Sequence, residues 1–68
     1  MKDLIEELKN KNYVYVIAGL DRDLEGKLEE VIRAGSLVFW KIKEIDGSIW
    51  FISPVKIVAI WEIPEEIK

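Results

Sequence analysis

The chain has 68 residues, 50% of them hydrophobic and 34% charged, with a formal net charge of −3 and neither cysteine nor histidine. It is long enough for one domain, residues 1–68, and the missing cysteine and histidine exclude a disulfide framework and the usual zinc sites, which leaves self-association to stabilise so small a core. The acidic balance disfavours nucleic acid as a partner, and no segment is apolar enough for a membrane span or a signal peptide, so we expect a cytoplasmic protein.

Residues 3–10 are expected to form a short amphipathic helix. Asp3 can cap its first turn, and three apolar side chains then share one face: Leu4, Ile5 and Leu8. Glu7 and Lys11 are spaced for an i,i+4 ion pair. Residues 13–18 follow as a strand of β-branched and aromatic residues that is apolar on both faces.

Residues 24–33 are expected to form a second helix, after a break at residues 19–23. Their apolar residues recur at helical spacing, and Gly35 stands where a helix-terminating glycine is common. Gly26 lies inside the segment and weakens a helix by about 1 kcal/mol relative to alanine. The apolar stripe consists of Leu24, Leu28, Val31 and Ile32.

The Asp46-Gly47 dipeptide is the clearest local signal in the chain, because it favours a two-residue hairpin turn. The turn predicts two strands, residues 37–45 and 48–52. In this register Lys43 pairs with Trp50. One face of the hairpin, which includes Ile49 and Phe51, is then core, and the other face places Trp50 between lysine stems.

Residues 57–63 form the last expected strand, bounded by Pro54 and Pro64. The order helix, strand, helix, hairpin, strand gives an α+β fold with a small antiparallel sheet of about four strands and two short helices. The large aromatic residues are more than one layer of two short helices can cover, and exposed apolar surface of that size is typical of an interface. The residues expected to mediate self-association are Trp40, Trp50, Trp61, Phe39 and Tyr15.

The sequence contains no catalytic constellation. Without histidine no serine can act as a Ser-His nucleophile, and there is no glycine-rich phosphate loop. Asp21, Asp23 and Glu25 resemble the start of a calcium loop, but Ile32 occupies the position of its bidentate glutamate, so we interpret these acids as a helix N-terminus. We therefore expect no enzyme, no cofactor and no metal site.

Lysines around the hairpin leave a second function open, because lysines beside Trp50 could neutralise and stack a strand of nucleic acid. The candidate lysines are Lys41, Lys43 and Lys56. The interpretation favoured by the sequence is that lysine stems cover an exposed tryptophan, since Glu44 and Asp46 dilute the positive charge.

The spacing of apolar residues from Asn12 to Ile67 resembles the RemA-like family of extracellular-matrix gene regulators. The likeness covers an aliphatic strand, a helix with residues spaced by four, a glycine before a branched strand and a closing Pro-Glu-x-Ile. In this chain these features are residues 13–18, Leu24 with Leu28, residues 35–38 and residues 64–67. The family's Gly-Arg-Arg-Thr-Arg hairpin corresponds to residues 43–47 here, which contain no arginine, so the resemblance implies the fold and ring-forming habit of that family rather than its DNA binding. A weaker likeness, to small flagellar proteins of the FlbD type, covers only the last third of the chain.

The sequence therefore predicts a homo-oligomeric, RemA-like regulatory or scaffolding module. Two alternatives stay open: a ring-shaped nucleic-acid binder that uses the hairpin lysines, and a subunit of a larger hetero-complex whose other chain covers the apolar face. The abundance of lysine, glutamate and isoleucine is also common in proteins of heat-loving organisms.

Overall fold

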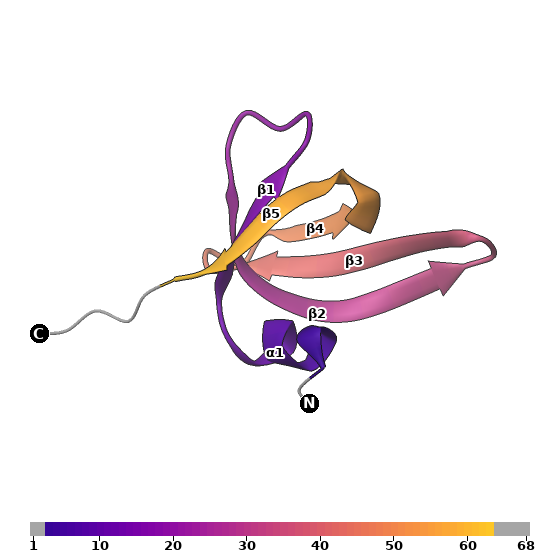
Figure 1. The fold of residues 1–68 in the computed structure, drawn as a ribbon, viewed down its shortest axis with the longest axis horizontal. Coiled ribbons are helices and arrows are strands. Elements are labelled where there is room, and N and C mark those ends of the chain that lie inside the picture. Colours follow the sequence, from indigo (N-terminus) through magenta and orange to yellow (C-terminus); the bar gives the residue numbers. More distant parts are fainter. Residues whose placement is uncertain (1–2, 64–68) are drawn as a thin grey trace, which may run out of the picture.

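The computed structural model describes residues 3–63. They form a short helix at the N-terminal end, followed by the strands of one antiparallel sheet (Figure 1). The elements in chain order are α1 (Leu4–Asn10), β1 (Tyr13–Ile17), β2 (Leu24–Ala34), β3 (Leu37–Glu44), β4 (Ile49–Ile52), the 3₁₀ turn η1 (Pro54–Lys56) and β5 (Ile57–Glu62). The sheet order is β4-β3-β2-β1-β5, so the first and last strands of the chain are neighbours.

The predicted fold, with two helices and about four strands, is wrong. Residues 24–34 form β2, the longest strand, and the sheet has five strands in the described part of the chain. The error has a physical origin in a β-bulge, because the pairing of β2 with β3 shifts between Leu28 and Glu30. Leu24 and Leu28 face the core by ordinary strand alternation, and the extra residue then brings Val31 to the same side. The bulge therefore gives the apolar residues of this strand the sequence spacing that is typical of one face of a helix.

The first helix is confirmed, and its start follows from local chemistry. Asp3 is the N-cap, and its Oδ1 accepts a hydrogen bond from the Ile5 amide at 3.2 Å. Leu8 is completely buried, which fixes this short helix against β2 (Figure 1). The predicted pair also forms, with Lys11 Nζ 3.5 Å from Glu7 Oε2.

The core lies where α1 and the inward faces of the strands meet. β1 contributes alternate residues of one face, and β2, β3 and β4 contribute aliphatic residues opposite them. The core consists of Leu8, Tyr13, Tyr15, Ile17, Leu24, Leu28, Ile42 and Ile52. Half-buried Trp40 and Trp50 pack against its edge.

The β3–β4 hairpin is confirmed, but its register differs by one residue from the predicted one. The Gly47 amide donates to the Glu44 carbonyl and the Glu44 amide to the Ser48 carbonyl, at 2.9 and 2.8 Å, so three residues rather than two form the loop. Gly47 adopts φ +97°, as this loop type requires. Ile42 therefore pairs with Trp50, and because a one-residue slip exchanges the faces of a strand, Trp50 points to the core side instead of toward the lysines.

Candidate functional site

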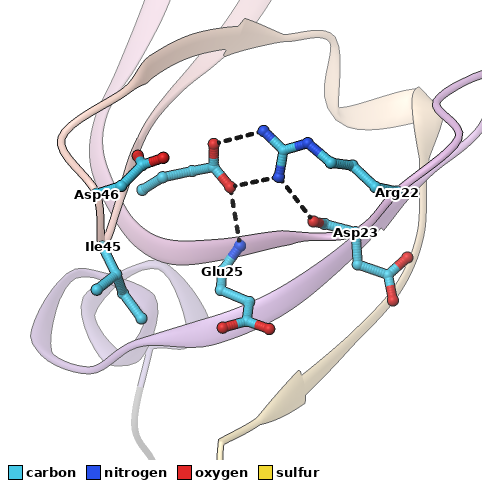
Figure 2. A pocket seen from close by; sticks show the side chains of 6 residues that line it. Arg22, Asp23, Glu25, Ile45 and Asp46 are labelled. Carbon is cyan, nitrogen blue, oxygen red and sulfur yellow. Dashed lines mark hydrogen bonds and ion pairs between the residues drawn. The ribbon is translucent and has the colours of Figure 1, made fainter.

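Glu44, the last residue of β3, is the buried charged residue of the described chain, with 6% of its surface exposed. Four donors from three segments converge on its carboxylate. Arg22 Nη2 and Nη1 donate to Oε1 and Oε2 at 2.9 and 3.0 Å, Trp50 Nε1 donates to Oε1 at 2.9 Å, and the Glu25 amide donates to Oε2 at 3.4 Å. Figure 2 shows the two-pronged contact with Arg22, which comes from the loop between β1 and β2.

The position of Glu44 is set by Gly26, its partner on β2. A Cβ atom at Gly26 would overlap the backbone of Lys43 and Glu44, so β2 and β3 approach more closely here than any other residue would permit. This close approach brings the start of β2 over the end of β3. It places the Glu25 amide within reach of the carboxylate.

The surroundings of Glu44 favour its ionised form. The hydrogen bond from Arg22 is the largest influence and lowers the pKa of Glu44 to about 2, and those from Trp50 and the Glu25 amide act in the same direction against the effect of burial. The same contact raises the pKa of Arg22, whose guanidinium also lies 5.6 Å from the centroid of the Trp50 ring. Glu44 thus has no proton to give near neutral pH, and its lone pairs are occupied.

A shallow hollow of about 270 Å³ opens beside this carboxylate (Figure 2). Its lining carries one cation, Arg22, which Glu44 already neutralises, and three further acids: Asp23, Glu25 and Asp46. The hollow therefore disfavours anions. No group of three or more acidic, cysteine or histidine side chains within residues 3–63 could hold a metal ion. The arrangement joins the loop before β2 to β3 and β4, and that structural role accounts for the hydrogen bonds that Glu44 accepts.

A second hollow, of about 750 Å³, lies between the end of α1 with the connection that follows it, Lys27 of β2, Ile45 of the β3–β4 loop and the end of β5. Lys11 crosses this region, and its Nζ donates to Glu62 Oε2 at 3.0 Å. The hydrogen bond to Glu62 raises the pKa of Lys11. Tyr13 also donates to Glu7 at 3.2 Å, so these polar side chains tie the helix to the first and last strands.

The two edge strands of the sheet are better candidates for a functional surface than the two hollows. β4 and β5 are the outermost strands, and each has β partners on one side only among the described residues. Each also displays large apolar side chains. They are Ile49 and Phe51 on β4, 43% and 58% exposed, and Val58 and Trp61 on β5, 67% and 49% exposed.

The register also fixes which backbone groups of β4 are free. Glu44 and Ser48 are joined by a ladder hydrogen bond, so hydrogen-bonded pairs recur at every second residue from that point. Trp50 and Ile52 then bond to β3. The N–H and C=O groups of Ile49 and Phe51 point away from β3, toward the open edge.

The residues predicted to mediate self-association are separated by the structure. Tyr15 is fully buried in the core of the single chain, and Trp40 and Trp50 are half-buried beside it. Trp61 stands exposed on edge strand β5, and Phe39 is half-buried on β3. Sequence reasoning missed Phe51, Ile49 and Val58, because it assigned no edge to the sheet and placed Phe51 in the core.

The candidate lysines are also divided. Lys41 and Lys43 share one face of β3, whereas Lys56 lies in η1 on the connection to β5. Trp50 belongs to the opposite face, so the predicted platform of Trp50 between two lysines is wrong. Phe51 and Ile49 stand there in its place, opposite Lys41 and Lys43.

Comparison with known proteins gave no matching family model, no matching curated protein and no matching solved structure. The helix that the RemA-like resemblance places at Leu24 and Leu28 is strand β2. The closing residues 64–67 of that resemblance lie outside the described residues. Within residues 3–63 no helix has the length and apolar character to cross a membrane.

Proposed function

We propose that this chain is a non-enzymatic module that assembles with copies of itself through its sheet edges, with a regulatory or scaffolding role. In the proposed contact, β4 of one copy pairs with β5 of the next. The observation that carries the proposal is that both edge strands are largely apolar, although β5 ends at Glu62 and its pairing with β1 is interrupted by a bulge between Val16 and Ile17. Residues 49–52 and 57–61 contain no charged residue and no proline, although lysine, proline and inward-pointing charges are the usual means of keeping an edge strand monomeric.

Pairing β4 with β5 is favoured over pairing two like edges, because it uses both edges of every copy. Two β4 strands or two β5 strands in contact would leave the other edge of each copy open. A contact between unlike edges is repeated from copy to copy, and it gives a closed ring where the rotation between copies closes. Such an assembly also supplies the stabilisation that a 68-residue chain without disulfides or zinc lacks.

The RemA-like resemblance supports this proposal in one respect only, the ring-forming habit that it implies. The proposal also places this scaffolding role in the cytoplasm, as the sequence predicts. The hetero-complex alternative predicts instead that the purified chain is a monomer and that its edges pair with a different protein.

The test is the native mass in solution, with each edge blocked in turn. Ile49→Pro removes a donor from the free edge of β4 without touching the β3–β4 ladder, because the Ile49 amide points outward. On β5, Val58→Lys combined with Trp61→Lys introduces edge lysines at exposed positions. Val55→Lys is the matched control, since Val55 is 86% exposed but lies in η1 rather than on an edge strand.

We expect the unmodified chain and Val55→Lys to form the same defined oligomer, and each blocked variant to be a folded monomer by circular dichroism. An equimolar mixture of the two blocked variants should give a dimer, because one free β4 and one free β5 remain. A blocked variant that dimerises alone would show like-edge pairing and overturn the proposed contact. An unmodified chain that is monomeric at every concentration would overturn self-assembly itself.

A further inference from the structure

Three lysines and two apolar residues gather on the outer face of β2, β3 and β4. We call this surface the lysine face; it comprises Lys27, Lys41, Lys43, Ile49 and Phe51. The register aligns them, with Lys43 between Lys27 and Ile49, and Lys41 opposite Phe51. Strand alternation directs the neighbouring residues, Leu28, Ile42 and Trp50, to the core side.

Lys27 and Lys43 lie directly opposite each other on adjacent strands. Like charges in that position destabilise a sheet. No ion pair or hydrogen bond relieves them among the described residues, since the pairs formed there belong to Lys11 and Arg22. A bound anion would relieve the repulsion between these two exposed cations.

The nearby carboxylates do not supply that relief. Glu44 faces the core side and is occupied by Arg22, and Asp46 accepts a hydrogen bond from the Ser48 amide at 2.9 Å. Glu30 lies opposite Lys41, and Glu25 precedes Lys27 by two residues on the same face. Glu29, the extra residue of the β2 bulge, is exposed next to Glu30. The carboxylates of β2 therefore gather near Lys41, and Glu25 is the carboxylate on β2 that lies beside Lys27 and Lys43.

We propose that the lysine face binds single-stranded nucleic acid, with phosphates at Lys27, Lys43 and Lys41 and a base stacked on Phe51. Nonspecific binding of single strands combines cations for the backbone with an exposed aromatic ring for the bases. The Phe51 ring is 58% exposed and lies opposite Lys41, so both elements occur on adjacent strands. An acidic polypeptide would satisfy the lysines but leave the ring without a partner.

The test is fluorescence anisotropy with labelled 12-residue oligo(dT) and oligo(U), titrated with the full chain at several salt concentrations. Three phosphate contacts on a single strand predict a slope of log affinity against log salt of about −2. Lys27→Gln combined with Lys43→Gln should weaken binding at low salt at least about tenfold and reduce the slope to about −0.7. Arg33→Gln is the matched control, because Arg33 is exposed on the opposite face of the same two strands, and its affinity should stay unchanged.

Phe51→Leu separates stacking from charge, because it keeps an apolar side chain on β4 and removes the ring. We expect it to weaken binding about five- to a hundredfold while the salt slope is kept. The native mass of every variant is measured on the same samples, so a failure of assembly is distinguished from a failure of binding. The proposal is overturned if neither oligonucleotide binds at low salt, if Arg33→Gln weakens binding as much as the lysine variant, or if polyglutamate competes as strongly as oligo(dT).

Discussion

Gly26 and Glu44 lie opposite each other on β2 and β3, and each determines what the other can do. The glycine lets the two backbones approach so closely that a side chain between them has no room. The carboxylate then reaches the amide of Glu25, near the start of β2, and the guanidinium of Arg22, in the loop before it. The close backbone approach at Gly26 and the ion pair between Glu44 and Arg22 thus stabilise the same part of the sheet.

Gly26→Ala should therefore destabilise the chain by about 3 kcal/mol or more, because the new Cβ meets backbone atoms that cannot move aside. The measurement is the free energy of unfolding from urea denaturation. Gly35→Asn is the control: Gly35 has φ +63° and open space around it, and asparagine tolerates that conformation, so its cost should be about 1 kcal/mol or less. Equal costs for the two substitutions would contradict the close approach of β2 and β3.

Glu44→Gln should cost about 2 kcal/mol in the free energy of unfolding, since the charged partner of Arg22 is lost while an oxygen acceptor is kept. Glu44→Ala should cost more, because it also leaves Trp50 Nε1 and the Glu25 amide without their acceptor. Urea denaturation followed by tryptophan fluorescence gives both values. If glutamine and alanine are equally well tolerated, the carboxylate does not anchor the loop.

Stability should depend on pH through Glu44. Its pKa is about 2 in the folded chain and 4.5 in its ordinary state, so its contribution is fully present above pH 4.5 and is lost as the pH falls toward 2. The difference in unfolding free energy between the unmodified chain and Glu44→Gln should accordingly shrink between pH 5 and pH 2.5. A difference that stays constant over this range would mean that the carboxylate titrates normally.

Leu8→Ala should cost about 2–5 kcal/mol, since Leu8 is completely buried and attaches α1 to the core. In a domain of this size such a loss is expected to abolish most of the folded population at 37 °C. Leu4→Ala is the matched control on the same helix, because Leu4 is 59% exposed and its replacement should change stability by less than about 0.5 kcal/mol. Thermal melts by circular dichroism distinguish the two.

The sequence predicted the elements whose signals are local. Asp3 caps α1 as expected, the β-branched and aromatic residues at 13–18 predict the strand that forms at residues 13–17, and Gly47 marks the hairpin. These features depend on contacts within a few residues of each other. They can be recognised without knowing where the rest of the chain lies.

The features that failed depend on register between strands. The apolar residues of β2 have helical spacing because its bulge shifts them by one position after Leu28. In the sequence alone Gly26 therefore has the position of a helix-weakening residue. The loop at Gly47 has three residues instead of two, so each side chain of β4 lies on the face opposite to the predicted one. Trp50 therefore contacts Glu44, and Phe51 lies on the face of the lysines. Neither the bulge nor the loop length has a sequence signature that separates it from the simpler alternative.

The pairing of β1 with β5 bears on how this chain folds as it is made. β1 ends at Ile17, and its partner on this side begins only at Ile57, so one flank of β1 stays unpaired until the last strand has been synthesised. Contacts between residues so far apart in the sequence slow folding, because a long loop must close before they form. During that interval Val14 and Val16, which pair with Trp61 and Ala59 in the finished sheet, are exposed to any other strand that the nascent chain meets.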